Sequence, residues 1–265
     1  MPPRLLPCFL ASCWLWTGLP AHAQPDSLVV ANLSLPDSVW PRQREAVIEL
    51  LGQAGVDVVL IQQVRSHDRQ PPEICSLAVP LHMHCDFVSA DPPSQARRHG
   101  LAMLSRRRIL EEGASLLHGE DGSAPVAAGY WRLQVAQQAI NVYSASLASG
   151  QHLLQRRQRQ ASDLRDWMAS HDPALASVVV ARFGSRHTEL LQLMPGLDTA
   201  RKALDQKQAH GLDVLYPPSR LRLKASTVLE LHHPAPPSTN AGSTPAALPA
   251  QMLGIVVELE LPASP

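Results

Sequence analysis

Short runs of apolar residues, separated by turn-forming residues, recur along most of the chain. Runs of this length that are rich in Val, Leu and Ile are typical of buried strands rather than helices. The predicted strands are Ser27–Leu33, Asp57–Ile61, Gly100–Ser105, Tyr130–Ala136, Ile140–Leu147, Ser177–Phe183, Gly211–Tyr216, Leu221–Leu231 and Leu253–Leu261.

Two segments show the spacing of an amphipathic helix instead. One runs from Pro41 to Ala54, where Gly55 is a typical helix stop, and the other runs from about Leu153 to His171. The second helix is expected to bury its apolar positions and to expose its Arg and Gln residues. Because strands that read as hairpins outnumber the helices, the pattern favours an α/β sandwich with mixed sheets over a wound parallel sheet.

The first 23 residues have the pattern of a secretory signal peptide. Arg4 precedes an apolar run from Leu5 to Trp16, and Ala21-His22-Ala23 follows as a small-residue cleavage site. Residues 1–23 are therefore predicted to be removed, which predicts an exported protein, periplasmic or secreted. An alternative is a lipoprotein signal in which Cys13 bears the lipid.

The remaining residues, 24–265, are long enough for one sizeable domain. Lys plus Arg and Asp plus Glu both number 23, so no net charge favours nucleic acid or anionic lipid as a partner. No segment after residue 23 is apolar enough to cross a bilayer. Residues 234–250 are rich in Pro, Ala, Ser and Thr and are predicted to form a mobile loop.

Cys75 and Cys85 are the only cysteines that follow the signal segment. In an oxidising compartment such a pair, closing a short loop, is favoured to form a disulfide. Two unbonded, buried thiols are the alternative.

Several predicted strands end in local sequences that recur together in one family of proteins. VVAN ends at Asn32, DVVLIQQV spans residues 57–64, and GLAMLSR spans residues 100–106. ASLAS precedes a helix with Arg156, Arg157 and Gln160. The remaining segments are Ala181-Arg182-Phe183-Gly184, Leu212-Asp213-Val214-Leu215 and Ala250-Gln251-Met252 before the last strand.

In their order, these segments resemble the endonuclease/exonuclease/phosphatase superfamily. The resemblance implies a four-layer α/β/β/α sandwich with two mixed sheets packed face to face and helices outside. It also implies cleavage of phosphate esters with a divalent metal, usually magnesium.

The side chains that perform this chemistry in the family are mostly replaced here. Only Asn32 and Asp213 keep the family identity. Neutral or cationic residues stand where the family has a metal-holding Glu, a His at the scissile phosphate, an Asp with its companion Asn, and an Asp-His pair; these positions are Gln63, Ser146, Arg182, Gly184, Gln251 and Met252.

These replacements predict an inactive site without a metal. Magnesium prefers oxygen ligands of which at least one is anionic, and Gln63 supplies none. A guanidinium about 5 Å from a dication would be repelled by roughly 7 kcal/mol at an effective dielectric near 20. The expected role is therefore binding or scaffolding. The alternative is a Mg²⁺- or Mn²⁺-dependent phosphodiesterase, phosphatase or nuclease that uses displaced residues such as Asp205, His210, His232 or His233.

Arg182 admits two interpretations. It can serve as a fork for an anionic small molecule, joined by Arg132. Alternatively, it pairs with Asp213 across the old site and neutralises that carboxylate. The sequence does not name the ligand.

Overall fold

The computed structural model describes residues 27–35, 40–67, 70–119, 125–183, 187–204, 211–231 and 250–262. The expected signal segment, residues 1–23, lies outside this part of the chain, and so does the expected loop at 234–250 except for its last residue.

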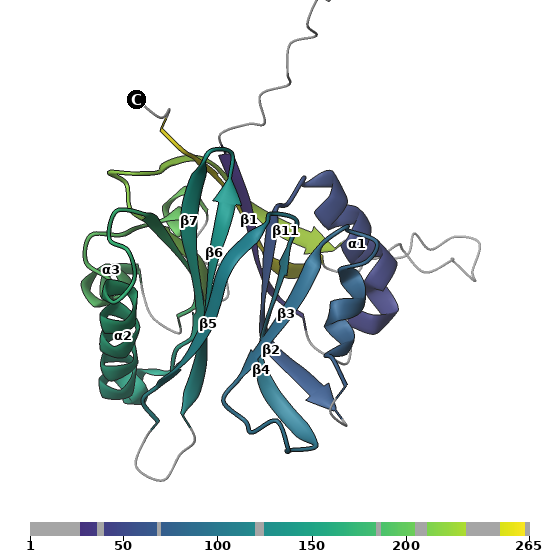
Figure 1. Ribbon diagram of the computed structural model, residues 1–265, viewed down its shortest axis with the longest axis horizontal. Coiled ribbons are helices and arrows are strands. Elements are labelled where there is room, and N and C mark those ends of the chain that lie inside the picture. The colour runs from purple at the N-terminus through teal and green to yellow at the C-terminus, as the bar shows by residue number, and fades with distance from the viewer. Residues whose placement is uncertain are drawn as a thin grey trace, which may run out of the picture.

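Two six-stranded sheets pack face to face, and helices cover their outer sides (Figure 1). In sheet A the order is β11-β12-β1-β2-β4-β3, and in sheet B it is β5-β6-β7-β8-β10-β9. The predicted four-layer sandwich of mixed sheets is confirmed. The strands of sheet A are β1 (Ser27–Ser34), β2 (Val58–His67), β3 (His84–Ser89), β4 (Arg97–Ser105), β11 (Arg222–Leu231) and β12 (Gln251–Glu260). Those of sheet B are β5 (Ile109–Leu117), β6 (Val126–Val135), β7 (Gln138–Ser146), β8 (Ala176–Arg182), β9 (Asp198–Thr199) and β10 (Leu212–Tyr216).

Each sheet contains one parallel pair of strands, and a helix connects its two members. In sheet A, α1 (Arg44–Gln53) connects β1 to β2. In sheet B, α2 (Leu154–Ala169) connects β7 to β8, and the short α3 (His187–Leu193) follows. A parallel pair needs such a crossover because a tight hairpin can only return the chain antiparallel.

Three apolar clusters form the core. One lies between the sheets and includes Trp131 and Val257. A second packs α1 against the outer face of sheet A, with Leu51 at its centre, and a third packs α2 against the outer face of sheet B, with Leu164. Strand residues alternate between the inner cluster and one outer cluster, as the two-residue period of a strand requires.

Some elements differ from the sequence-based expectation. The first helix begins with a 3-10 turn at Trp40–Gln43, and the strands β3 and β5 were not predicted. Leu154, expected to be buried in α2, is 40% exposed. Among the described residues, no helix has the length and apolar character needed to cross a membrane.

Cys75 and Cys85 are joined by a disulfide, with their Cα atoms 5.6 Å apart. Cys75 lies in the 3-10 helix η2 (Glu73–Leu77) and Cys85 lies in the edge strand β3. The bond therefore fastens η2, whose Ile74 and Leu77 fill the outer core of sheet A, to the edge of that sheet.

Replacing both cysteines by Ala is expected to lower the free energy of unfolding by about 3 kcal/mol, because the unfolded chain regains the freedom of the short loop. Guanidinium unfolding measures the change. A reductant should lower the stability of the parent protein by a similar amount and leave the double variant unchanged. Equal stability of the oxidised parent and the variant would contradict this role.

Candidate functional site

The candidate site lies where the carboxyl ends of the two parallel pairs face each other across the sandwich. β1 and β2 bring Asn32, Gln62 and Gln63 from sheet A. β7 and β8 bring Ser146 and Arg182 from sheet B, and these two residues are register partners in the parallel ladder. Sequence positions separated by more than 100 residues therefore meet at one end of the molecule.

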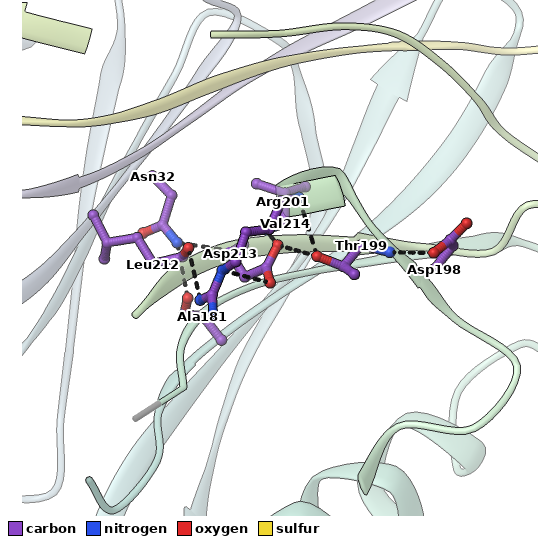
Figure 2. A network of polar contacts seen from close by, with 8 residues as sticks. All are labelled: Asn32, Ala181, Asp198, Thr199, Arg201, Leu212, Asp213 and Val214. Atoms are coloured by element: carbon purple, nitrogen blue, oxygen red, sulfur yellow. Dashed lines mark hydrogen bonds and ion pairs between the residues drawn. The ribbon is translucent and has the colours of Figure 1, made fainter. Parts of the chain in front are cut away.

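Asn32 joins the two sheets directly. Its side chain is fully buried, and its amide nitrogen donates to the backbone carbonyls of Ala181 and Asp213, both at 2.9 Å (Figure 2). Both carbonyls belong to sheet B, on β8 and β10. The opposite sheet thus satisfies both hydrogen-bond donors of the buried amide, and Asn32 links the two sheets.

Gln62 also forms hydrogen bonds between the two sheets. Its amide nitrogen lies 3.0 Å from the Ser144 hydroxyl and 3.4 Å from the Asn32 amide oxygen. The Gln62 side chain is buried, and its oxygen has no hydrogen-bond partner among the described residues. The sequence analysis missed Ser144, because a buried serine in an apolar strand gives no sequence signal of its own.

Gln63 owes its direction to a β-bulge. Between Ile61 and Val64 the register of β2 with β4 shifts, and Gln63 adopts a left-handed backbone with φ of 60°. A bulge places one extra residue in a strand and re-aims its side chain. Gln63 turns toward the cleft in this way, and its side-chain oxygen accepts a hydrogen bond from the Arg182 guanidinium.

The expected pair between Arg182 and Asp213 is not formed. In the β8–β10 ladder Arg182 lies opposite Leu212, and Asp213 lies opposite Ala181. Neighbouring positions of a strand point to opposite faces, so the two side chains diverge. Arg182 reaches the inter-sheet side, and Asp213 shares the outer side with Leu215.

Asp213 instead belongs to a buried network with Thr199 and Arg201 (Figure 2). One carboxylate oxygen accepts from the Thr199 hydroxyl at 2.6 Å and from the Val214 backbone at 2.8 Å. The other lies 3.3 Å from the Arg201 guanidinium. Burial raises the pKa of the Asp213 carboxyl, and the charge of Arg201 opposes that rise.

Arg132 does not join Arg182 at an anion site. It lies on β6 beside Tyr130, on the face of sheet B that packs against α2, whereas Arg182 reaches the inter-sheet side. Its guanidinium is 2.8 Å from Glu111 and also donates to Asn141 at 3.2 Å. The proposed two-arginine fork is therefore wrong.

The remaining predicted positions lie at the start of the last strand and after β8. The Gln251 oxygen accepts from the Gln43 side chain at 3.3 Å. Met252 is partly buried against the inter-sheet core. Gly184 lies outside the described residues, and so do Asp205, His210, His232 and His233.

A cavity of about 710 Å³ opens beside Gln63 and Ser146 at this end of the sandwich. Apolar side chains in its lining combine with amides, hydroxyls, the Arg65 guanidinium, and Asp91 and His99, which the sequence analysis also missed. The Asp91 carboxylate accepts the His99 backbone N–H at 2.6 Å and lies 3.6 Å from the ring. The lining residues are Ser34, Leu35, Gln62, Gln63, Arg65, Ala90, Asp91, His99, Gly100, Leu101, Pro125, Val126, Ala127 and Ser146.

A model of the endonuclease/exonuclease/phosphatase family matches residues 31–180, more than half of the chain. The chain belongs to this family. No curated protein sequence matches it.

Solved structures share the family fold with this chain. The human Nocturnin catalytic domain with bound sulfate anion aligns with a TM-score of 0.65 at 14% identity, covering 90% of this chain and 96% of that one. A mannosyl-6-phosphatase from Bacteroides thetaiotaomicron aligns with a TM-score of 0.65 at 13% identity, covering 88% and 99%. TDP2 from D. rerio complexed with single strand DNA product aligns with a TM-score of 0.63 at 11% identity, covering 88% and 99%.

The residues at the family's metal positions do not fit a divalent cation here. The Gln63 oxygen already accepts from a guanidinium, and a cation cannot share that oxygen without repulsion from Arg182. The Asp213 carboxylate is turned to the outer face and held by Thr199 and Arg201. Within the described residues, no three His, Cys, Asp or Glu side chains are grouped as metal ligands.

Replacing Arg201 by Met is expected to lower the free energy of unfolding by about 3 kcal/mol at pH 7, because the buried Asp213 carboxylate then loses its cationic partner. Without Arg201 the folded-state pKa of Asp213 rises further above its ordinary value of 3.8. The folded variant then holds a proton that the unfolded chain has released, so its stability falls as the pH rises through that folded-state pKa.

The difference in free energy of unfolding between the parent and Arg201→Met should accordingly become smaller as the pH is lowered from 7 toward about 4. Urea unfolding at several pH values measures it. Arg222→Met, which removes an exposed partner of Glu260, is the control and should change stability by less than about 0.5 kcal/mol throughout. A deficit that stays constant between pH 7 and pH 4 would contradict the buried pairing of Asp213 with Arg201.

Proposed function

We propose that the cleft binds an anionic small molecule and does not hydrolyse it. The observation that carries this proposal is the contact between Arg182 and Gln63. A guanidinium stands at the position where the family resemblance puts an Asp, and it donates to the side chain at the position of the family's metal-holding Glu.

Arg182 has spare capacity for an anion. Arginine presents five N–H donors in a planar fork that matches phosphate, sulfate or carboxylate. Among the described residues, Gln63 is its one hydrogen-bond partner. The Arg182 side chain is partly exposed, so an anion can approach it from solvent.

The cleft next to Arg182 suits a ligand that has an apolar part. Leu101, Val126 and Ala127 form one wall, and the Ser34 and Ser146 hydroxyls lie among the polar lining groups. Neutral amides and hydroxyls can bind ester oxygens or hydroxyl groups without adding charge. The sulfate bound to human Nocturnin, which shares the fold, also supports an anion as the ligand.

Hydrolysis of a phosphate ester requires a group that removes a proton from water and a group that stabilises the developing negative charge. Met252 has no basic atom, and Ser146 carries no charge. With the Gln63 oxygen accepting from Arg182, the family positions Gln63, Ser146 and Met252 offer neither a base nor an anionic metal ligand. These features support binding without turnover.

A second candidate function is hydrolysis by residues outside the family positions. The closeness of Asp91 and His99 in the cleft favours it, because an imidazole with a carboxylate 3.6 Å from its ring is a candidate general base. Turnover of a bis-aryl phosphate with Mg²⁺ or Mn²⁺ that is lost in His99→Ala would establish this alternative.

The proposal includes export from the cytoplasm, as the pattern of residues 1–23 predicts. The disulfide between Cys75 and Cys85 is consistent with it, because structural disulfides persist in oxidising compartments.

Arg182→Gln is expected to abolish binding of inorganic phosphate, because it removes the charged donor and keeps a side chain of similar polarity. In the parent, phosphate at ten times its dissociation constant should stabilise the fold by about 1.4 kcal/mol, or about 3–5 °C in Tm. Calorimetric titration and thermal shift measure both effects.

Arg159→Gln is the matched control, since Arg159 is an exposed residue of α2 and its loss changes the net charge equally. It should bind phosphate as the parent does. If Arg182→Gln retains the affinity of the parent, the proposed site is wrong.

The double variant Gln63→Glu with Arg182→Asp is expected to gain affinity for Mn²⁺. It removes the cation and supplies two carboxylates that face each other at the same strand ends. Thermal stabilisation by millimolar Mn²⁺ is the measurement.

Gln63→Glu alone should gain nothing, because the new carboxylate would pair with Arg182. The absence of any gain in the double variant would mean that Gln63 and Arg182 do not occupy the family's metal positions.

A further inference from the structure

β5 is an edge strand of sheet B with one side open. It pairs with β6, and its outer side has no strand partner in the part of the chain that the structure describes. Figure 1 shows β5 next to β6. An open edge presents a row of backbone N–H and C=O groups that can pair with another strand.

Two of the exposed large apolar side chains lie on this strand. Leu110 is 43% exposed and Leu116 is 58% exposed, whereas the other exposed ones, Val79 and Leu154, lie on separate elements. Two leucines that flank an open edge form a surface that would gain from being covered.

The other edges are less suited to pairing. β3 has six residues and β9 has two. β11 is interrupted by two register shifts, and its Arg222 and Lys224 pair with acidic residues of β12. β5 keeps an unbroken register with β6 from Glu111 to Leu117, after a single irregularity near Leu110.

The sequence of β5, ILEEGASLL, is self-complementary about Gly113. In an antiparallel pair, two residues that lie opposite each other either both hydrogen-bond across the pair or both point their backbone groups away. Backbone groups alternate in direction along a strand, so in a pair of identical strands the two opposite residues are separated by an even number of positions. The two-fold axis therefore passes through a residue and not between two residues. An axis at Glu112 would set two glutamates against each other, and an axis at Ala114 would set Glu112 against Leu116. An axis at Gly113 avoids both conflicts.

We propose that β5 pairs antiparallel with β5 of a second copy of this chain, about a two-fold axis at Gly113. Leu110 then meets Leu116 of the partner, Glu111 meets Ser115, and Glu112 meets Ala114. The charge of Glu111 is already balanced within its own chain by Arg132, 2.8 Å away. The six-stranded sheets B of the two copies join into one continuous sheet.

The strand is short, so the interface is small. One strand from each copy, with two flanking leucines, buries less than the roughly 1,200 Å² that stable complexes need. The expected dissociation constant is therefore on the order of micromolar or weaker. A two-fold contact of this type closes on itself and forms dimers rather than fibres.

Sedimentation velocity from about 1 to 500 µM tests the proposal, because that range spans the expected dissociation constant. The parent should shift from monomer to dimer as its concentration rises. Leu116→Lys should remain a monomer, since the substitution sets a charge against Leu110 of the partner. Leu154→Lys, the same exchange at an exposed leucine of α2, should dimerise as the parent does.

A cross-linking experiment locates the axis. Gly113→Cys places two cysteines directly opposite each other, with Cβ atoms about 5 Å apart, and oxidation should link them rapidly. A Cβ at Gly113 meets only Tyr130, at 3.6 Å, so the variant should fold. Ala114→Cys, one residue off the axis, should cross-link much more slowly. Both variants are made with Cys8 and Cys13 replaced by Ser.

A parent protein that stays monomeric over the whole range would overturn the proposal. So would Leu116→Lys that dimerises like the parent, or Ala114→Cys that cross-links as fast as Gly113→Cys. None of these outcomes bears on phosphate binding at Arg182. That residue lies on β8, which two strands separate from β5 in sheet B.

Discussion

The arrangement of the two sheets depends on the buried amide of Asn32. Apolar contacts between facing sheets are non-directional and would tolerate small shifts of one sheet over the other. The two hydrogen bonds from Asn32 to carbonyls of β8 and β10 do not, because a shift would leave a fully buried donor unsatisfied. Gln62 and Ser144 add a second directional contact beside it. These hydrogen bonds fix the registration of the two sheets at this end of the molecule.

Arg182 and Gln63 meet because of the same registration. β8 is held opposite the bulge of β2, and the bulge turns Gln63 toward it. The end of β8 thus carries a guanidinium next to the Gln63 amide at the end of β2. Under the proposed function, this guanidinium makes the adjoining cleft suited to holding an anion.

The sequence predicted the parts of the fold that apolar patterning controls. The central strands and both long helices were recognised because each buries a continuous or periodic set of apolar residues. β3 and β5 were missed because they are sheet edges with few buried positions and therefore have no clear alternation.

Side-chain partners were predictable only in part. The proximity of Asn32, Gln63, Ser146 and Arg182 followed from the family resemblance. The partner of Asp213 depended on the register of β8 with β10, which sequence patterning does not determine. An offset of one residue in that register moves a side chain to the other face of the sheet. Asp91 and His99 approach each other at the β3–β4 connection, and the left-handed backbone of Gln63 lies in the β2 bulge. None of these leaves a local sequence signal.

The strand order also constrains how the chain folds as it is synthesised. All of sheet B comes from one continuous stretch, Ile109 to Tyr216, and can assemble before the C-terminal strands emerge. Sheet A cannot, because β12 inserts between β1 and β11 and consists of residues 251–260. During synthesis β1 therefore has one side open until β12 emerges, and an unpaired strand edge of this kind favours aggregation.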